Sequence, residues 1–186
     1  MAHVIEHAPS GRAKCRGCDR RIDSGELRFG ERRPNAFGEG EMTLWFHLPC
    51  AAYKRPEPFL EMLDGVATAD VSADELVVAQ ALRPAAEFGV AHRRVPRLDK
   101  VDRAPTGRAR CRHCRELIGK DGWRIRLVFF EEHRFQPSGF IHAACAKAYF
   151  ETSDVLERIR HFNPGLGKAE CESIGTALER GDAADR

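Results

Sequence analysis

The chain has 186 residues, of which 42% are hydrophobic and 31% charged, the composition of a soluble globular protein rather than a disordered one. The formal net charge of +2 does not by itself indicate a class of binding partner. No run of about 18 apolar residues is present, so we expect no membrane span, and the N-terminus has no apolar stretch of signal-peptide length, so we expect no export. Seven cysteines, an odd number, argue against a disulfide framework and favour metal binding or reactive thiols.

The first predicted elements follow a Cys-x-x-Cys pair at residues 15–18. Residues 26–29 alternate apolar and polar side chains, which predicts a half-buried strand. Proline, asparagine and glycine residues between positions 34 and 40 indicate a turn or loop. Residues 45–47 are then the returning strand, and this strand leads into His47-x-x-Cys50. We expect Trp45, two residues before the histidine, to pack in the core around the metal site.

Helices are predicted in the second half of this segment. Residues 51–54 favour a short helix, and Ser72 with Glu75 has the pattern of a capping box at the start of a longer one. The sequence predicts that Pro84 ends that helix. Its expected apolar stripe consists of Leu76, Val78, Ala79 and Leu82.

The segment from residue 104 onward repeats the first. Residues 104–111 match residues 8–15 at an offset of 96, and 27 residues lie between Cys-x-x-Cys and His-x-x-Cys in the second copy against 28 in the first. The offset also pairs Arg28 with Arg124, Val78 with Ile174, and Leu82 with Leu178. One module of about 85 residues is therefore used twice.

The second copy predicts the same elements in the same order. Residues 123–127 and 140–142 are expected strands, with Phe140 in the place of Trp45, and residues 146–149 begin a short helix. A last helix is expected from about residue 167 to 180. Cys171, Ile174 and Leu178 lie at helical spacing in it, so the seventh cysteine is most simply a core residue.

The cysteines outside this helix form two sets of three thiolates and one imidazole. Four such ligands complete a tetrahedral zinc shell and leave no position open for water or substrate, as in structural zinc sites. The predicted ligands of two structural Zn²⁺ ions are Cys15, Cys18, His47, Cys50, Cys111, Cys114, His142 and Cys145. A module of this size has a small core, so we expect zinc binding to contribute to folding.

Two other interpretations of the cysteines explain the spacing less well than zinc does. Reduced cysteines can pack as small apolar side chains, but packing does not require this spacing. A redox Cys-x-x-Cys motif would not explain the two His-x-x-Cys pairs. His113 lies inside the second Cys-x-x-Cys pair and competes as a ligand. The first copy has Gly17 at that position, so we favour His142.

The near-neutral net charge conceals a segregation along the chain. Residues 91–150 carry a formal +8, whereas residues 54–90 carry −4 and residues 151–186 carry −3. Of the 30 basic residues 24 are arginine, whose planar fork suits bidentate contacts with phosphate. The basic segments therefore favour a nucleic-acid backbone as partner.

At the level of motifs, Ser10-Gly11-Arg12-Ala13-x-Cys15-x-x-Cys18, Leu27-Arg28 and Trp45-Phe46-His47-x-x-Cys50 resemble the poly(ADP-ribose) polymerase-type zinc finger. The second copy resembles it from Thr106-Gly107-Arg108-Ala109 to His142-x-x-Cys145. The resemblance implies an α+β fold with two small zinc-stabilised modules in tandem, each a short antiparallel sheet plus helices around a Cys3His site. We expect the first finger at residues 1–88, a basic linker at 89–103 and the second finger at 104–186.

Fingers of that family recognise DNA strand breaks by shape. The resemblance implies that paired arginines contact the backbone and that apolar loop side chains cap the base pair exposed at a nick or an end. The residues carried over as DNA-binding are Arg12, Arg28, Phe37, Met42, Arg108, Arg124 and Phe135. The expected partner is nicked or broken duplex DNA, with a separate repair enzyme as a second candidate partner, and neither a membrane nor a small-molecule substrate is expected.

Catalysis is not expected, because both predicted zinc shells are closed and neither a P-loop nor a dinucleotide fingerprint is present. We also expect no enzyme domain of the kind that such fingers accompany, since these 186 residues are taken up by the two modules. An alternative function is an adaptor that recruits a separate repair enzyme through its acidic helical segments, or general nucleic-acid binding without break specificity. The arginine-rich composition favours a bacterial source and hence the cytoplasm or nucleoid; a eukaryotic source would imply the nucleus.

Overall fold

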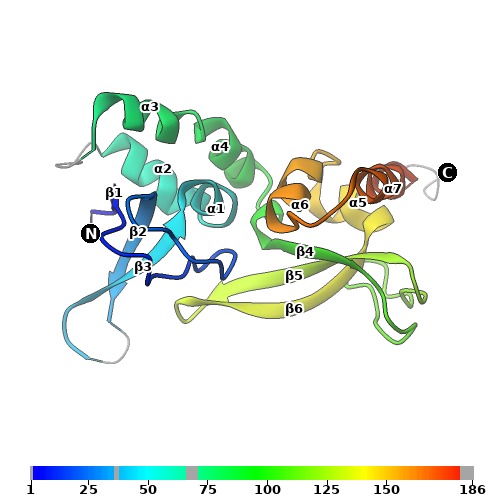
Figure 1. Cartoon of the computed structure of the whole chain (residues 1–186). Helices are drawn as coiled ribbons and strands as arrows, with labels where there is room; N and C mark the ends of the chain where they lie inside the picture. The colour runs from blue at the N-terminus through cyan, green and yellow to red at the C-terminus, as the bar shows by residue number, and fades with distance from the viewer. Residues whose placement is uncertain (1, 36–37, 66–70, 181–186) are drawn as a thin grey trace. The chain divides into compact units, whose positions relative to one another are not determined.

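The structure is a computed structural model that describes residues 2–35, 38–65 and 71–180. It divides into two compact units, one made of Met1–Ala91 with Glu131–Phe135 and the other of His92–Phe130 with Gln136–Arg186. Each unit has a three-stranded sheet and helices, as the tandem α+β expectation requires (Figure 1). Among the described helices, none is both long and apolar enough to cross a membrane.

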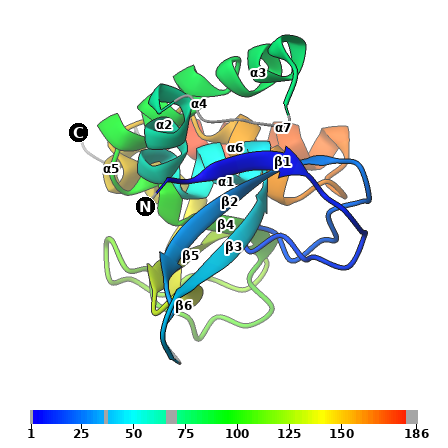
Figure 2. The same ribbon diagram turned by 90° about the vertical axis from the view of Figure 1, so that its left-hand side faces the viewer.

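The sheet of the first unit consists of β1 (Val4–His7), β2 (Leu27–Pro34) and β3 (Glu41–His47), antiparallel in the order β1-β2-β3. Figure 2 shows the three strands side by side with the helices behind them. Phe29 on β2 lies opposite Ile5 on one side and Phe46 on the other, and all three are buried. The ring of Phe29 meets that of Phe59 edge to face at 5.6 Å. This face of the sheet therefore forms the core.

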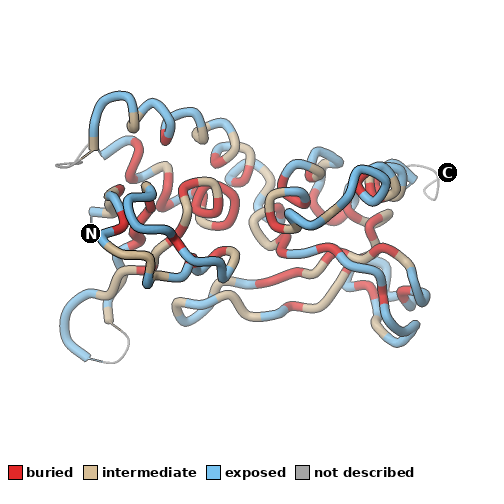
Figure 3. Tube along the Cα trace, in the orientation of Figure 1, coloured by how far each residue is buried: buried red, intermediate tan, exposed pale blue. Residues whose placement is uncertain are grey.

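Four helices complete the first unit: α1 (Leu48–Lys54), α2 (Pro56–Asp64), α3 (Ala73–Gln80) and α4 (Arg83–Ala91). The predicted capping box is present, because Ser72 Oγ accepts from the Glu75 backbone N–H and Glu75 Oε2 accepts from the Ser72 N–H at 2.9 Å. Buried residues concentrate in α1, α2 and the strands, whereas α3 is largely exposed (Figure 3).

Two predictions about these helices are wrong. Val78 is 57% exposed, and of the four residues of the expected apolar stripe only Ala79 is buried. The reason is that α4 packs on α1 and α2, with Ala86 and Gly89 buried, so α3 has no core to cover. Pro84 is the second residue of α4 rather than the end of α3, a position where its missing N–H costs no helical hydrogen bond.

The second unit repeats the sheet with β4 (Leu98–Arg103), β5 (Trp123–Glu131) and β6 (Arg134–His142), in the order β4-β5-β6. Only Glu132 and His133 connect β5 to β6, and both have positive φ, 48° and 64°. Two such residues make the tight turn that matches the twist of a hairpin. The helical part follows as η2 (Ala143–Cys145), α5 (Ala146–Phe150), α6 (Leu156–Phe162) and α7 (Lys168–Glu179).

The core of the second unit confirms the interpretation of the seventh cysteine. Cys171, Ile174 and Leu178 on α7 are all buried, and α7 packs on η2 and α5. Ile125 and Leu127 on β5 are also fully buried. Cys171 is therefore a core residue, as its helical spacing predicts.

The segment expected as a linker, residues 89–103, is ordered. It contains the last turn of α4, the short η1 (Val95–Arg97) and the whole of β4. Leu98 and Val101 are buried in the second unit, because β4 pairs with β5 from Leu98 opposite Leu127 to Arg103 opposite Trp123. The predicted boundaries at 88 and 104 remain expectations, but residues 98–103 form an edge strand rather than a free connection.

Candidate metal centres

The first Cys3His set gathers around the end of β3. Cys15 and Cys18 lie in the loop between β1 and β2, His47 ends β3, and Cys50 lies in α1. The four ligand atoms lie within 4.8 Å of one another. His47 Nδ1 is 3.4 Å from Cys18 Sγ and 3.8 Å from Cys50 Sγ.

The second set repeats this arrangement at the end of β6. Cys111, Cys114, His142 and Cys145 again place their ligand atoms within 4.8 Å of one another. His142 Nδ1 is 3.4 Å from Cys114 Sγ and 3.8 Å from Cys145 Sγ. His113, the competing ligand, is exposed and does not belong to the set.

These distances fit zinc. Zn–S and Zn–N bonds of about 2.3 and 2.0 Å at a tetrahedral ion put sulfur and nitrogen about 3.5 Å apart, close to the 3.4 and 3.8 Å in both sets. Crowding of the thiols also separates their acidities: the hydrogen bond with Cys15 lowers the pKa of Cys18 and raises that of Cys50. A divalent cation relieves this crowding by holding all three as thiolates. The chain thus carries two structural Zn²⁺ sites.

Backbone groups hold the ligands in the same way in both units. The ring nitrogen Nε2 of His47 lies 2.9 Å from the Arg21 carbonyl oxygen, and Nε2 of His142 lies 3.2 Å from that of Leu117. These contacts fix the tautomer that leaves Nδ1 free for the metal. Each loop turns back through a residue with positive φ, Asp19 at 61° and Arg115 at 69°, whose N–H donates to the carbonyl of Cys15 or Cys111.

The loops that carry the Cys-x-x-Cys pairs are strongly basic. We call residues 11–21 the first zinc loop and residues 107–120 the second. Each contains five basic residues and one acidic residue, a formal +4, and a zinc ion with three thiolates reduces this to about +3. All ten side chains are exposed: Arg12, Lys14, Arg16, Arg20, Arg21, Arg108, Arg110, Arg112, Arg115 and Lys120. Over the part of the chain that the structure describes, none of the ten forms an ion pair with a carboxylate, and Arg20 donates to the Cys18 sulfur at 3.5 Å.

A second pair of arginines lies on the sheets and is held differently. Arg28 donates through Nε and Nη2 to Oε1 of Glu6 on β1, and its Cζ lies 3.5 Å from the centre of the Trp45 ring. Glu6, Arg28 and Trp45 project from the face of the sheet opposite Phe29 and the helices, because neighbouring residues of a strand alternate.

The second unit has the same three-part stack. Arg124 donates to both oxygens of Asp102 at 2.9 and 2.7 Å, and its Cζ lies 3.8 Å from the centre of the Phe140 ring. The hydrogen bonds that Arg124 donates to Asp102 raise the pKa of Arg124. An acidic residue, an arginine and an aromatic ring are thus stacked in the same way in both copies, although the acid and the ring differ in residue type.

The expectation that Trp45 and Phe140 pack in the core around zinc is wrong. Both rings are only partly buried, because they lie under the guanidinium groups on the outer face of the sheet. Sequence reasoning also missed the carboxylates. At the 96-residue offset Glu6 corresponds to Asp102. An acidic residue at the same position of both copies was the sequence signal that could have identified these two carboxylates.

The predicted base-capping residues have varied positions. Phe37 lies outside the described residues. Met42 is the second residue of β3 and Phe135 the second of β6, and both are partly buried. The roles of these residues and of the four arginines toward DNA stay predictions.

Comparison with known proteins matches the first unit to a described family. Residues 6–74 match the poly(ADP-ribose) polymerase and DNA-ligase Zn-finger region. A poly [ADP-ribose] polymerase of Sarcophaga peregrina is 30% identical over 138 residues, which is 68% of this chain and 14% of that protein. The corresponding protein of Drosophila melanogaster is 26% identical over 144 residues, 70% of this chain and 14% of the relative.

A shorter match supports the same relationship. Poly [ADP-ribose] polymerase 1 of Caenorhabditis elegans is 40% identical over 50 residues, 27% of this chain and 5% of the relative. The chain thus spans about a seventh or less of the length of these proteins. All three come from animals, so the expectation of a bacterial cytoplasm finds no support in them.

Proposed function

Because this chain carries tandem zinc fingers of the poly(ADP-ribose) polymerase type, we propose that it binds DNA through its two zinc loops and recognises strand breaks. The observation that carries the proposal is the repeated excess of exposed positive charge on these loops that no carboxylate neutralises. Phosphate groups are the polyanion that such a surface attracts, and binding releases their counterions.

Arg12 and Arg108 are the primary phosphate contacts in this proposal. They occupy equivalent positions of the repeat, and both are exposed. Neither is bound to a carboxylate elsewhere in the described ranges. A guanidinium group without an internal partner loses no ion pair when it meets a phosphate, so its full charge contributes to binding.

Arg28 and Arg124 contribute differently. A carboxylate already holds one edge of each guanidinium group, and an aromatic ring covers one face. What these arginines offer a phosphate is the remaining N–H edge in a fixed orientation. We assign them a positioning contact on the outer face of each sheet, with Met42 and Phe135 as candidates for apolar contact with an exposed base.

The chain described here acts in this proposal as a binding module rather than a catalyst. Each zinc site uses four protein ligands, so no coordination position is left for water or substrate. Break recognition is the finer part of the proposal, and it rests on the apolar candidates near the strand ends. A nuclear location would follow from this role in a eukaryotic cell.

The salt dependence of DNA affinity tests the phosphate contacts. Arg12→Ala combined with Arg108→Ala is expected to weaken duplex binding and to lower the slope of log K against log salt by roughly 2, since each lost contact is worth about 0.9. Arg83→Ala with Arg160→Ala removes the same charge away from the zinc loops and is the matched control. An equal change of slope in both double variants contradicts specific contacts at Arg12 and Arg108.

Competition between DNA forms tests break recognition separately. Zinc-loaded protein is bound to a labelled nicked duplex and challenged with nicked, blunt-ended and intact circular DNA. The proposal expects intact circles to compete much less well than the other two. Equal competition by all three rejects break recognition and leaves general DNA binding in place.

An adaptor role is the second candidate, and one observation favours it. Val77 and Val78 on α3 are 66% and 57% exposed, within a segment, residues 54–90, that carries a formal −4. Adjacent exposed valines on a helix are the kind of surface that a protein partner covers. Retention on a DNA resin separates the two candidates, because an adaptor without DNA contact flows through at moderate salt.

A further inference from the structure

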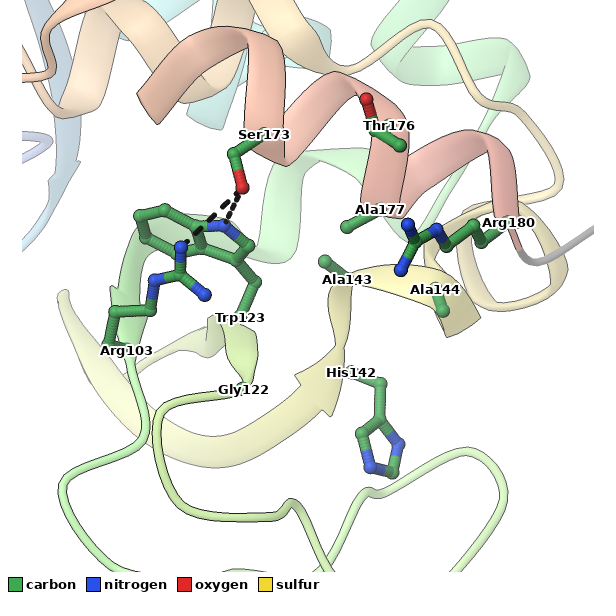
Figure 4. A pocket seen from close by; sticks show the side chains of 10 residues that line it. All are labelled: Arg103, Gly122, Trp123, His142, Ala143, Ala144, Ser173, Thr176, Ala177 and Arg180. Carbon is green, nitrogen blue, oxygen red and sulfur yellow. Dashed lines mark hydrogen bonds between the residues drawn. The ribbon is translucent and has the colours of Figure 1, made fainter. Parts of the chain in front are cut away.

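A hollow of about 420 Å³ lies within the second unit, at the end of its sheet where β4 and β6 end and β5 begins. Helix α7 forms the opposite wall. Figure 4 shows Arg103 and Trp123 on one side, and the Arg180 side chain extending from the end of α7 toward Ala143 and Ala177 on the other. Three alanines, Ala143, Ala144 and Ala177, line the space between the arginines and keep it open.

The lining is positive and rich in hydrogen-bond donors. Two guanidinium groups and no carboxylate border the hollow. Arg103 lies over the Trp123 ring, with Cζ 3.9 Å from its centre, and donates to the Asp121 carbonyl at 2.8 Å. Trp123 Nε1 donates to Ser173 Oγ at 2.9 Å. Arg103 and the Trp123 ring are therefore held in place before any ligand arrives.

Arg180 is the lining residue that is best placed to bind a ligand. Its side chain is exposed, and within the described residues it makes neither a hydrogen bond nor an ion pair. Five N–H donors on a planar fork thus face a hollow whose lining holds the neutral hydroxyls of Ser173 and Thr176 and the zinc ligand His142, but no anionic side chain. The complementary ligand group is an oxyanion that accepts several hydrogen bonds at once.

The first unit has no such pair of arginines. At the 96-residue offset, Arg103 corresponds to His7 and Arg180 to Pro84. His7 Nε2 instead lies 3.0 Å from a carboxylate oxygen of Glu75 on α3, so the residue equivalent to Arg103 has an acidic partner within its own unit. The two arginines are therefore not needed to build the module, because the first copy folds without them.

We propose that this pocket binds the phosphate group of a nucleotide, as a second anion site distinct from the zinc loops and the outer face of the sheet. Two arginines match the oxygens of a phosphate. The volume lies within the roughly 300–1,000 Å³ of pockets for small organic ligands, and a phosphate ion alone would leave most of it empty. The alanine-lined floor and the edge of Trp123 provide apolar walls for the attached sugar.

The proposal is tested on the full zinc-loaded chain by following the indole N–H signal of Trp123 in NMR spectra. The chain has two tryptophans, so Trp45 serves as the internal reference, and a Trp45→Phe variant assigns the signals. Adenosine 5′-monophosphate is expected to shift the Trp123 signal in a saturable way while the Trp45 signal stays in place. Adenosine, without the phosphate, is expected to have no effect.

Variants decide whether the arginines are responsible. Arg180→Ala is expected to weaken nucleotide binding about tenfold or more, because it removes charge-assisted hydrogen bonds. Arg103→Lys is also expected to weaken nucleotide binding, because it removes the planar fork. Arg160→Ala removes an exposed arginine of the same unit outside the pocket and should change nothing. An unmoved Trp123 signal at millimolar nucleotide, equal shifts with adenosine, or unchanged affinity in Arg180→Ala each overturns the proposal.

A further comparison identifies the source of the phosphate. The probe is a short single-stranded oligonucleotide with a 5′-phosphate. If it binds more tightly than the mononucleotide, and more tightly than the same oligonucleotide with a 5′-hydroxyl, the pocket is assigned to a strand end. No gain over the mononucleotide assigns it to free nucleotides. These measurements need no duplex DNA, so they remain decisive even if binding at the zinc loops fails.

Discussion

Glu6 and Arg28 face each other across β1 and β2, with the Arg28 guanidinium bound to the Glu6 carboxylate and lying flat on the Trp45 ring. Asp102, Arg124 and Phe140 reproduce this relationship in the second unit. The Arg28 side chain is only 8% exposed, whereas that of Glu6 is 35% exposed. The pair thus stabilises the edge of the sheet and at the same time fixes the orientation of an arginine on its outer face.

Removal of the charge on Glu6 should destabilise the first unit. Glu6→Gln keeps the shape of the side chain but loses the charge-assisted hydrogen bonds, and we expect the free energy of unfolding to fall by about 1–2 kcal/mol after allowance for partial exposure. Urea denaturation measures this. Glu87→Gln is the control, since Glu87 is well exposed and its ion pair with Arg83 is long, at 3.9 Å. A comparable loss of stability in Glu87→Gln contradicts a special role for Glu6.

Metal content separates the ligand cysteines from the core cysteine. The intact chain should bind two zinc ions, Cys15→Ser and Cys111→Ser one each, and Cys171→Ser still two, because Cys171 lies on α7 away from both sets. Atomic emission on the purified protein gives the count. A ratio near one for Cys171→Ser would reject the ligand assignment.

Removal of zinc by a chelator should unfold both units. Zinc binding and folding are coupled in modules of this size, so complete removal of zinc is expected to reduce both the far-UV and near-UV circular dichroism. Re-addition of zinc should restore them. Unchanged spectra after verified removal of the metal would show that the zinc sites are not structural.

Two glycines should respond to alanine in opposite directions. A Cβ atom on Gly30 would lie 2.6 Å from the Trp45 ring and 2.8 Å from both Thr43 and Val4, so Gly30→Ala is expected to cost about 1–3 kcal/mol. Gly175 lies in α7 with nothing within 4 Å, so Gly175→Ala should stabilise by roughly 0.5–1 kcal/mol. Thermal unfolding compares them, and a shift of the same sign in both contradicts this account of Gly30.

A buried ion pair should matter more than an exposed one. Glu31 is fully buried and accepts hydrogen bonds from Arg55 at 2.7 and 2.6 Å, so Glu31→Ala should cost about 3–5 kcal/mol by leaving a charge without its partner. Asp64 is 68% exposed and pairs with Arg83, so Asp64→Ala should cost less than about 1 kcal/mol. Urea denaturation of both variants tests the difference, and similar values would mean that the Glu31 site is hydrated.

Residue type and spacing in the sequence were sufficient to predict both zinc sites, the repeat, the capping box at Ser72 and the buried Cys171. Each of these depends on residues that are near in sequence or chemically distinctive, because thiolates and imidazoles at fixed intervals have few other uses. The repeat made the prediction firm, since two independent copies show the same ligand order.

Only the tertiary structure decided the partners of these residues. Glu6 is 22 residues from Arg28 and meets it because of the strand register, and Val78 is exposed because α4 takes the place that α3 was expected to fill. The arginine pocket joins β4 to α7 across 70 residues, as the contact of Arg103 with Ser173 shows. Side-chain patterns in the sequence indicate which residues tend to be buried or to form an ion pair. The pairing of distant segments determines which residue each of them contacts.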